Sequence, residues 1–122
     1  MLKYFFSLFM MVACLATSNA QVDITLQNTN AFDTWSMQIV DSASNSYSTT
    51  LIPGGIYFAN GPLVFPVTFI ATSSAGCSAA GQYVAPPISQ SYPVTCGNTT
   101  SVSVTSTTSF PPLNGTFIAI AN

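Results

Sequence analysis

Three aspartates, Asp23, Asp33 and Asp41, are the only charged side chains after residue 20. General acid or base catalysis needs a titratable group beside the reacting atom, and often a second one nearby. No histidine, lysine, arginine or glutamate follows residue 20 to act as that second group, or to activate a serine or threonine hydroxyl. The sequence therefore predicts a protein that is not an enzyme and has no catalytic residue and no cofactor.

The same residues do not predict a metal site. The aspartates lack the spacing of an acidic calcium loop, which supplies oxygen ligands at alternate positions. Two cysteines without any histidine cannot complete the four ligands of a zinc site. No cation after residue 20 could neutralise phosphates, so nucleic acid is excluded as a partner. We expect Asp33 and Asp41 to initiate turns and Asp23 to face water.

Residues 1–20 have the layout of a secretory signal peptide. Lys3 is the only basic side chain, an apolar run follows over residues 5–15, and small residues precede the end of the segment at Ala20. The apolar run is shorter than the roughly twenty residues that a membrane-spanning helix needs. We predict cleavage after Ala20 and secretion of one domain over residues 21–122, with no transmembrane segment in the mature chain.

A second interpretation of this region uses Cys14. The three residues before it are Met, Val and Ala, and together with Cys14 they resemble a loose bacterial lipobox. The resemblance implies that Cys14 carries a lipid and becomes the mature N-terminus. The protein would then be anchored at the cell surface rather than released.

Two cysteines, Cys77 and Cys96, remain after the signal peptide. An exported protein lies in a compartment that tolerates disulfides, and two cysteines allow one intramolecular pairing. A bond between them would close a loop of about 20 residues and stabilise the fold by on the order of 3 kcal/mol. We predict one structural disulfide, because a redox pair would have the closer C-x-x-C spacing.

Alternation of apolar and polar residues with period two dominates the mature chain, and no window shows a helical period. Turn residues separate the alternating segments, as in the Asn-Gly-Pro of residues 60–62. Short strands at regular spacing are typical of an antiparallel β-sandwich. The sequence thus predicts one all-β sandwich of about seven strands, over residues 22–27, 35–39, 47–51, 56–59, 65–72, 101–108 and 115–121.

We expect the first two strands to form a hairpin with Ile24 opposite Ile39, because this pairing buries both apolar sets on one face. No two aspartates converge under this pairing. Trp35 shares the face of Ile39, which favours core packing over a role as a sugar-stacking platform.

The strand that ends at Leu51, followed by Ile-Pro-Gly over residues 52–54, and the tryptophan on an early strand, Trp35, resemble bacterial immunoglobulin-like domains. The resemblance implies an immunoglobulin-like architecture for the sandwich. It implies no activity and no ligand.

The segment between the two mature cysteines carries the candidate binding residues. It is rich in Gly, Ala, Ser, Pro and Gln, so we expect a disulfide-closed surface loop. Tyr83, Tyr92, Gln82 and Gln90 would present flat rings and neutral hydrogen-bonding groups, which suit a carbohydrate. The other interpretation is a rigid connection whose tyrosines pack over the end of the sandwich.

Two sequons, at Asn98 and Asn114, would accept N-linked glycans in a eukaryotic secretory pathway. The source of the chain decides whether they are used. They therefore do not select between functions.

The near absence of charge leaves sheet edges without their usual protection. Natural edge strands are often guarded by lysine or an inward-pointing charge, and none guards residues 101–108 or 115–121. Such edges are either covered by loops or join other chains. The leading hypothesis is a secreted, noncatalytic structural or adhesive protein that acts through neutral surfaces, with its own copy or a neutral glycan as partner. The alternatives are a small carbohydrate-binding module and a surface protein anchored through Cys14.

Overall fold

A computed structural model describes residues 21–109 and 114–122. The predicted signal peptide over residues 1–20, with Cys14, lies outside the described residues. Every regular element of the described part is a strand. No helix there is long and apolar enough to cross a membrane. The strands are β1 (Gln21–Asn28), β2 (Trp35–Asp41), β3 (Ser46–Leu51), β4 (Ile56–Pro62), β5 (Val67–Ser73), β6 (Ser78–Tyr83), β7 (Ile88–Cys96), β8 (Thr99–Ser109) and β9 (Asn114–Ala121).

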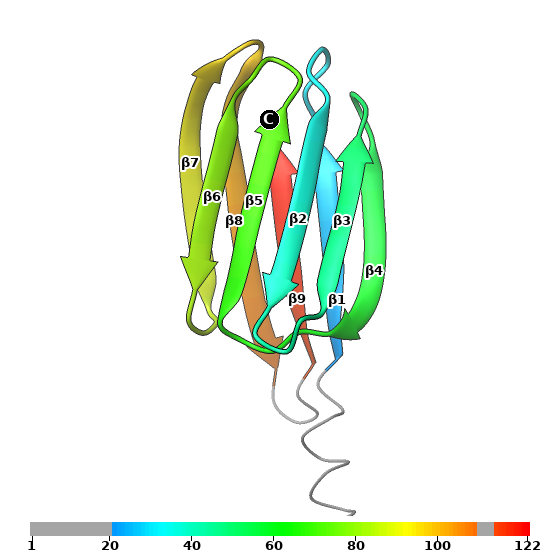
Figure 1. Cartoon of the computed structure of the whole chain (residues 1–122), viewed down its shortest axis with the longest axis vertical. Helices are drawn as coiled ribbons and strands as arrows, with labels where there is room; N and C mark the ends of the chain where they lie inside the picture. The colour runs from blue at the N-terminus through cyan, green and yellow to red at the C-terminus, as the bar shows by residue number, and fades with distance from the viewer. Residues whose placement is uncertain (1–20, 110–113) are drawn as a thin grey trace, which may run out of the picture.

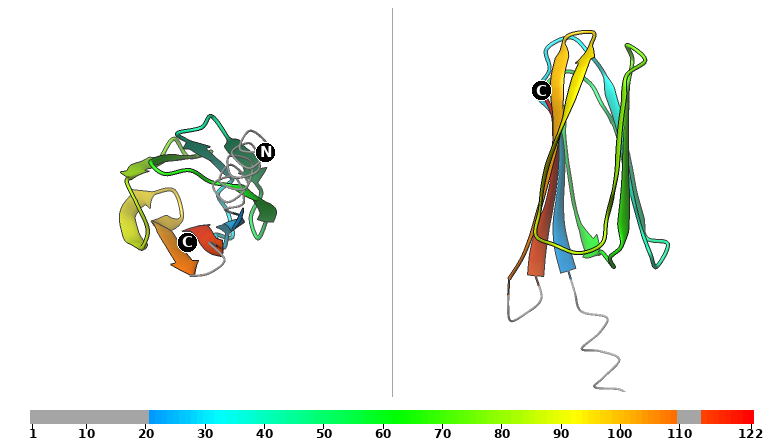
Figure 2. Two further views of the ribbon diagram at one scale, coloured as in Figure 1. Left: turned by 90° about the horizontal axis from the view of Figure 1, so that it is seen from below. Right: turned by 90° about the vertical axis from the view of Figure 1, so that its left-hand side faces the viewer.

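The strands form two sheets that face each other as the layers of a sandwich (Figures 1 and 2). The larger sheet has the order β4-β1-β9-β8-β7, and the smaller one has the order β3-β2-β5-β6. All neighbours are antiparallel except β1 and β9, which run in parallel. The predicted all-β sandwich is confirmed, with nine strands in place of about seven.

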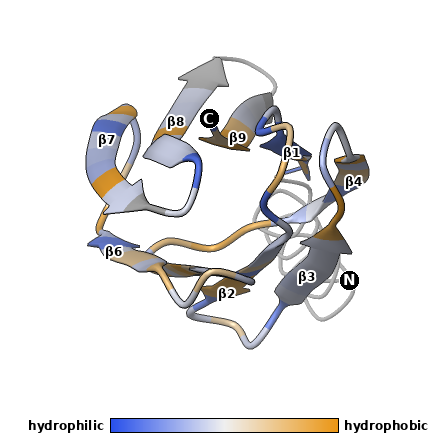
Figure 3. Cartoon of the chain, turned by 90° about the horizontal axis from the view of Figure 1, so that it is seen from above, coloured by the Kyte–Doolittle hydropathy of each residue, from blue (hydrophilic) through white to orange (hydrophobic). Residues whose placement is uncertain are grey.

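The core lies between the two sheets and follows the alternation of the sequence. Trp35 on β2, Phe69 on β5 and Phe117 on β9 are completely buried. The ring centroids of Phe69 and Phe117 lie 6.4 Å apart in a tilted arrangement. Figure 3 looks along the strands and shows the two layers, with the hydropathy of each residue marked along the ribbon. Burying each large apolar side chain contributes about 1.5 to 3 kcal/mol. The prediction that Trp35 packs in the core is confirmed.

The predicted hairpin between the first two strands is wrong. β1 and β2 belong to different sheets, and Ile24 lies opposite Ala59 on β4 and Phe117 on β9 rather than opposite Ile39. Alternation tells which face of a strand is buried, but not which strand is its neighbour. Two apolar faces can share one sheet or meet across the core, and here they meet across the core.

The predicted surface loop between the two cysteines is also wrong, because this segment forms β6 and β7. The two strands are edges of opposite sheets. The inward positions of β6 include Ala79, with only a methyl group, and Gly81, with no side chain, so the apolar period of two is concealed in the sequence. On β7 the inward positions include Ile88 and Val94, but Pro93 interrupts the pattern.

The strands expected at the edges are interior strands. β8 lies between β7 and β9, and β9 lies between β8 and β1. The edges are β4 and β7 in the larger sheet, and β3 and β6 in the smaller one. The predicted turn at residues 60–62 is instead the last part of β4, because these residues stay paired with β1.

Tyrosines close both open sides of the sandwich. On one side the hydroxyls of Tyr83 and Tyr92 hydrogen-bond at 2.6 Å, which joins β6 to β7. On the other side the Tyr47 hydroxyl of β3 donates to the Pro62 carbonyl of β4 at 2.8 Å. A tyrosine suits such a seam because its ring packs on the core while its hydroxyl reaches a partner at the surface.

Each of these seams needs a glycine beneath the hydroxyl. A Cβ atom on Gly81 would overlap the hydroxyls of Tyr83 and Tyr92, and a Cβ on Gly61 would overlap that of Tyr47. Close approach of a tyrosine hydroxyl therefore explains the glycine at both positions. Backbone conformation does not, since neither glycine has the positive φ that a turn glycine adopts.

Cys77 is buried just before β6. The side chain of Cys96 lies outside what the structure describes, so its bond with Cys77 stays a prediction. The turns beside the two cysteines are in contact, since a Cβ on Gly97 would lie 2.9 Å from the Cβ of Ala75. This proximity of the backbones is what the predicted pairing needs.

Candidate binding site at one end of the sandwich

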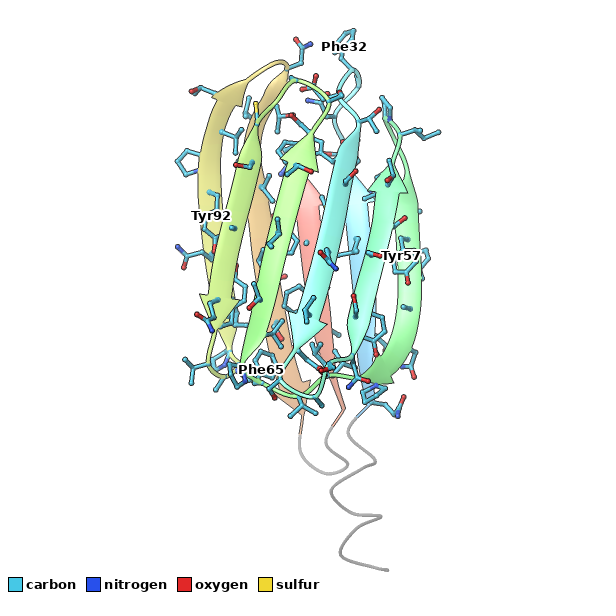
Figure 4. The ribbon with its side chains drawn as sticks, in the orientation of Figure 1. Phe32, Tyr57, Phe65 and Tyr92 are labelled. Atoms are coloured by element: carbon cyan, nitrogen blue, oxygen red, sulfur yellow. The ribbon has the colours of Figure 1, made fainter. Side chains whose placement is uncertain are left out.

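Two exposed apolar side chains lie at the end of the sandwich where β1 finishes. Phe32, in the connection between β1 and β2, is 73% exposed, and Ile52, in the connection between β3 and β4, is 68% exposed. Figure 4 shows Phe32 at this end, which is opposite the end where Gln21 begins β1. We call Phe32 and Ile52 together with the two connections, residues 29–34 and 52–55, the apical site.

Asn28, the last residue of β1, ties the two connections together. Its side chain is completely buried. The Nδ2 group donates to the carbonyl of Asp33 at 2.7 Å and to the carbonyl of Leu51 at 3.1 Å. The same group reaches the carbonyl of Ile52 at 3.3 Å, and the Oδ1 atom accepts from the backbone N–H of Asn30 at 3.0 Å. One amide therefore satisfies backbone groups in both halves of the apical site.

Asn30 fixes the turn that carries Phe32. Its Oδ1 atom accepts from the backbone N–H of Phe32 at 2.8 Å and from that of Asp33 at 2.7 Å. Its Nδ2 group donates to the Asn98 carbonyl at 2.6 Å, in the turn between β7 and β8. Asparagine favours such turns because its short side chain reaches nearby backbone groups. The loop that presents Phe32 is thus hydrogen-bonded to a third connection, the turn between β7 and β8.

Asp33 and Trp35 form a buried chain of hydrogen bonds with Thr99. The indole N–H of Trp35 donates to the Thr99 hydroxyl at 2.9 Å, and that hydroxyl donates to Asp33 Oδ2 at 2.8 Å. The backbone N–H of Asn98 donates to the same carboxylate at 2.8 Å. Asp33 was expected to initiate its own turn, but it holds the turn at 97–98 instead. Among the described residues no buried side-chain nitrogen or oxygen lacks a hydrogen-bond partner, which a buried network needs to be stabilising.

The apical site presents apolar surface outward and keeps its carboxylate inside. Its one carboxylate, Asp33, is 7% exposed and is occupied by its hydrogen bonds. What it offers outward is apolar surface on a loop that is already ordered. Pre-ordering lowers the entropy lost when a partner binds, and apolar anchors supply much of the binding energy at interfaces.

The other two aspartates lie elsewhere. Asp41 initiates the turn after β2, as predicted: its Oδ1 accepts from the backbone N–H groups of Ala43 at 3.0 Å and Asn45 at 2.7 Å. Burial raises the pKa of Asp41, but hydrogen bonds from the Asn45 side chain and from backbone N–H groups outweigh it and hold the pKa below its ordinary value. Asp23 is exposed, as expected, and accepts from the Asn60 amide at 2.5 Å.

The part of the chain that the structure describes holds no group of three His, Cys, Asp or Glu side chains that could bind a metal.

The four residues predicted to bind a carbohydrate do not share a surface loop. Tyr83 is buried and Tyr92 is half-buried, and their hydroxyls hydrogen-bond at the β6–β7 seam. Figure 4 labels Tyr92 on β7. Burial, together with the hydrogen bond and the charge of Tyr92, raises the pKa of Tyr83 well above its ordinary value. Gln82 and Gln90 are exposed, but they lie on different sheets. The structure thus brings the two tyrosines together as a structural pair.

The two sequons have different surroundings. Asn98 is exposed in the turn below the apical site, whereas the Asn114 side chain lies outside the described residues. The first sequon is completed by Thr100, which is exposed. Its middle residue, Thr99, is buried in the hydrogen-bonded chain.

A shallow depression on the outer face of the smaller sheet is the other notable surface feature. Its volume is about 350 Å³. It is lined by hydroxyl and amide side chains and one exposed isoleucine, namely Ser36, Gln38, Ser48, Thr50, Thr72 and Ile70. No charged side chain contributes to it. Neutral donors and acceptors beside an apolar side chain suit an uncharged polar ligand.

Sequence reasoning missed the apical site. The available signal was the pair Asn28 and Asn30 two residues apart, followed by Phe32 in an otherwise polar connection. Comparisons of this chain with protein-family models, with curated proteins and with solved structures find no match.

Proposed function

We propose that this is a secreted, noncatalytic structural or adhesive protein that binds its partner through the apical site. The observation that carries the proposal is the Phe32 side chain, which is 73% exposed on a loop held by buried hydrogen bonds. Leaving an aromatic ring in water has no benefit for folding, while a fixed apolar tip is what a contact surface requires. The lack of any base to activate a nucleophile supports a noncatalytic role.

The position of Gln21 is consistent with contact through the apical end, because Gln21 lies at the opposite end of the sandwich. β1 begins at Gln21, the residue that follows the predicted cleavage site, and it runs about 26 Å, at 3.3 Å per residue, to the apical end. Under the alternative of a lipid on Cys14, the anchor lies on the Gln21 side. Phe32 would then lie at the end of the sandwich that is farther from the anchor.

Replacing Phe32 by serine is expected to lower adsorption of the mature chain to a methyl-terminated surface by at least about tenfold, because a buried phenylalanine contributes about 1.5 to 3 kcal/mol. A quartz crystal microbalance measures this adsorption. Thermal unfolding should not change, since the ring makes few contacts in the folded protein.

Val84→Ser is the matched control for this experiment. Val84 is 79% exposed and lies between β6 and β7, at the opposite end of the sandwich. The Val84→Ser substitution should leave adsorption unchanged. Equal loss in the Val84→Ser and Phe32→Ser variants would mean that adsorption is unspecific and that the apical site is not the binding surface.

A carbohydrate-binding role is the second candidate, and the depression on the smaller sheet favours it. Its hydroxyl row runs across the strands, with Ser36 opposite both Thr50 and Thr72. The Ser36 and Thr50 hydroxyls already hydrogen-bond at 3.2 Å. Adjacent strands lie about 4.8 Å apart, so the row offers regularly spaced neutral groups to the hydroxyls of a sugar.

Titration of the labelled chain with neutral oligosaccharides, followed by amide chemical shifts, separates the two possible glycan sites. If the depression binds, shifts should concentrate at Gln38 and Ile70, and Gln38→Ala should weaken binding about tenfold, as expected for a lost hydrogen bond in a binding site. Gln90→Ala is the control. Shifts confined to Gln82, Gln90 and the tyrosines would instead favour the site predicted from the sequence.

We also propose that part of the fold is immunoglobulin-like. In variable-type immunoglobulin domains strand C′ extends the GFC sheet, and strand C carries a buried tryptophan. The order β3-β2-β5-β6 reproduces C′-C-F-G if β2 is strand C, and β2 carries the buried Trp35. A disulfide between Cys77 and Cys96 is part of this proposal, although it would join other positions than the B and F strands of that family.

A further inference from the structure

The four edge strands of the sandwich differ in how well they are protected. β7 contains Pro93 and a register shift between Pro93 and Cys96, both of which oppose pairing with another strand. The outward side chains of β3 and β6 are small or polar. β4 differs from all three, because its outward side chains Ile56 and Phe58 are 47% and 70% exposed. β4 carries neither a charged side chain nor an interior proline.

The backbone of β4 is also available along this edge. Hydrogen bonds in an antiparallel pair alternate along the strands. The backbone N–H of Asn28, at the end of β1, donates to the Gly55 carbonyl at 2.9 Å. Continuing the alternation from that point turns the backbone groups of every second residue, Ile56, Phe58 and Asn60, away from β1. The residues with free backbone groups are therefore the same ones whose side chains point outward.

We propose that the β4 edge pairs with the β4 edge of a second copy of this chain. A two-fold axis through Tyr57 would align the strands antiparallel and place Ile56 of each copy opposite Phe58 of the other. Both cross-strand pairs then join a β-branched and an aromatic side chain, a combination that stabilises sheets. The two five-stranded sheets become one continuous sheet of ten strands.

A second copy fits this edge better than a strand of different chemistry for two reasons. The edge is self-complementary in the register just described, so one surface supplies both the apolar partners and the backbone partners. Charge does not oppose the contact either, because Asp23 is the one acidic side chain on the outer face of this sheet and its carboxylate is bound by Asn60. Two identical acidic or basic patches would repel, and neither exists here.

The proposed interface is small, and its size predicts a low affinity. A pairing of single strands buries less than the standard interface of about 1,600 Å². We therefore infer a concentration-dependent equilibrium of monomer and dimer rather than a permanent dimer. Phe32 lies outside this interface, because Phe32 is at the end of the sandwich and Phe58 is on its side.

Sedimentation equilibrium of the mature chain, from micromolar to millimolar concentration, tests the proposal. The wild-type chain should form dimers, and Phe58→Lys should raise the dimer dissociation constant at least about tenfold, because lysine protects edge strands. Ser48→Lys places the same charge on the outward face of the β3 edge and should leave the constant unchanged. Circular dichroism of each variant shows that the fold is retained.

The register is tested by crosslinking. An equimolar mixture of the Ile56→Cys and Phe58→Cys variants should form a mixed disulfide on mild oxidation, because directly opposed residues lie within bonding range. Phe58→Cys alone should crosslink poorly, since its two copies are diagonal neighbours. A wild-type chain that stays monomeric at all concentrations would overturn the proposal, and so would a dimer that Ser48→Lys disrupts and Phe58→Lys does not. The Phe32→Ser adsorption experiment is unaffected by either result.

Discussion

Asn28→Ala is expected to destabilise the protein by at least about 3 kcal/mol, the largest effect of any single polar substitution that we foresee. The substitution removes the side-chain amide that donates to the carbonyls of Asp33 and Leu51 and accepts from the N–H of Asn30. A buried polar group that loses its partner costs about 1 to 3 kcal/mol. Since the Asn28 side chain is completely buried, water cannot replace it without opening the core.

Urea unfolding at neutral pH, followed by Trp35 fluorescence, measures the loss. Trp35 is a suitable probe because it is buried and bonded to Thr99 within the same network. Asn60→Ala is the matched control, because Asn60 is an exposed asparagine on a strand and bonds only to the Asp23 side chain. It should cost less than about 1 kcal/mol. Similar losses in the two variants would show that the Asn28 network does not hold the apical end.

The network also links stability to the proposed contact surface. Asn28 and Asn30 position the loop whose tip is Phe32, but neither side chain is exposed enough to meet a partner. An Asn30 variant that still folds should therefore adsorb less well than the wild type although Phe32 is intact. Position of the ring, and not its presence alone, then determines binding.

The sequence predicted the strands whose inward residues are large. Trp35 and Ile39 on β2, and Phe69 on β5, alternate with polar residues and are buried as expected. β6 could not be found in this way, because its inward residues include Ala79 and Gly81. A strand at the edge of a sandwich can have small inward residues when larger side chains fill the seam, here Tyr83 at the end of β6 itself and Tyr92 on β7.

Strand order could not be derived from alternation. The inward face of Ile24 is the same whether its neighbour is β2 or β4, so the hairpin first expected and the pairing observed bury similar surface. The connection between β1 and β2 decides the outcome. This connection carries the chain from one sheet to the other. Asn30 and Asp33 bind it to the turn at Asn98, between β7 and β8.

The apical site was hidden from the sequence for a related reason. Asn28 contacts residues 5, 23 and 24 positions away, and Asp33 contacts residues 65 and 66 positions away. Hydrogen bonds between segments so far apart depend on the sheet arrangement, which was itself unknown. Asparagine in a polar connection is common, and only its buried position marks it as structural.

Alkaline pH is expected to unfold the protein through its seam tyrosines. Burial, then the hydrogen bond and charge of Tyr92, raise the pKa of Tyr83, and burial, then the charges of Asp41 and Tyr57, raise that of Tyr47. In the unfolded chain tyrosines lose their protons near about pH 10. Above that pH the unfolded state releases protons that the folded state retains, so stability is complete below about pH 10 and falls as the pH rises further.

This chain makes the effect unusually easy to isolate. No lysine or arginine follows residue 20, so tyrosines dominate the titration of the mature chain above about pH 9. Urea midpoints measured by circular dichroism should fall from about pH 8 to about pH 10, and again from about pH 10 to about pH 11. Tyr83→Phe should lower the midpoint at about pH 8, because it removes a hydrogen bond worth about 1 kcal/mol, but the further loss toward about pH 11 should be smaller than in the wild type.

Tyr57→Phe serves as the control, because the Tyr57 hydroxyl takes part in neither seam bond. Its midpoint should follow the wild-type pH dependence closely. A Tyr83→Phe variant with the full wild-type loss between about pH 10 and 11 would show that the β6–β7 seam does not control alkaline stability. If Tyr47→Phe then removed the loss, the seam between β3 and β4 would be the one that opens, which is the seam beside the free edge that carries Phe58.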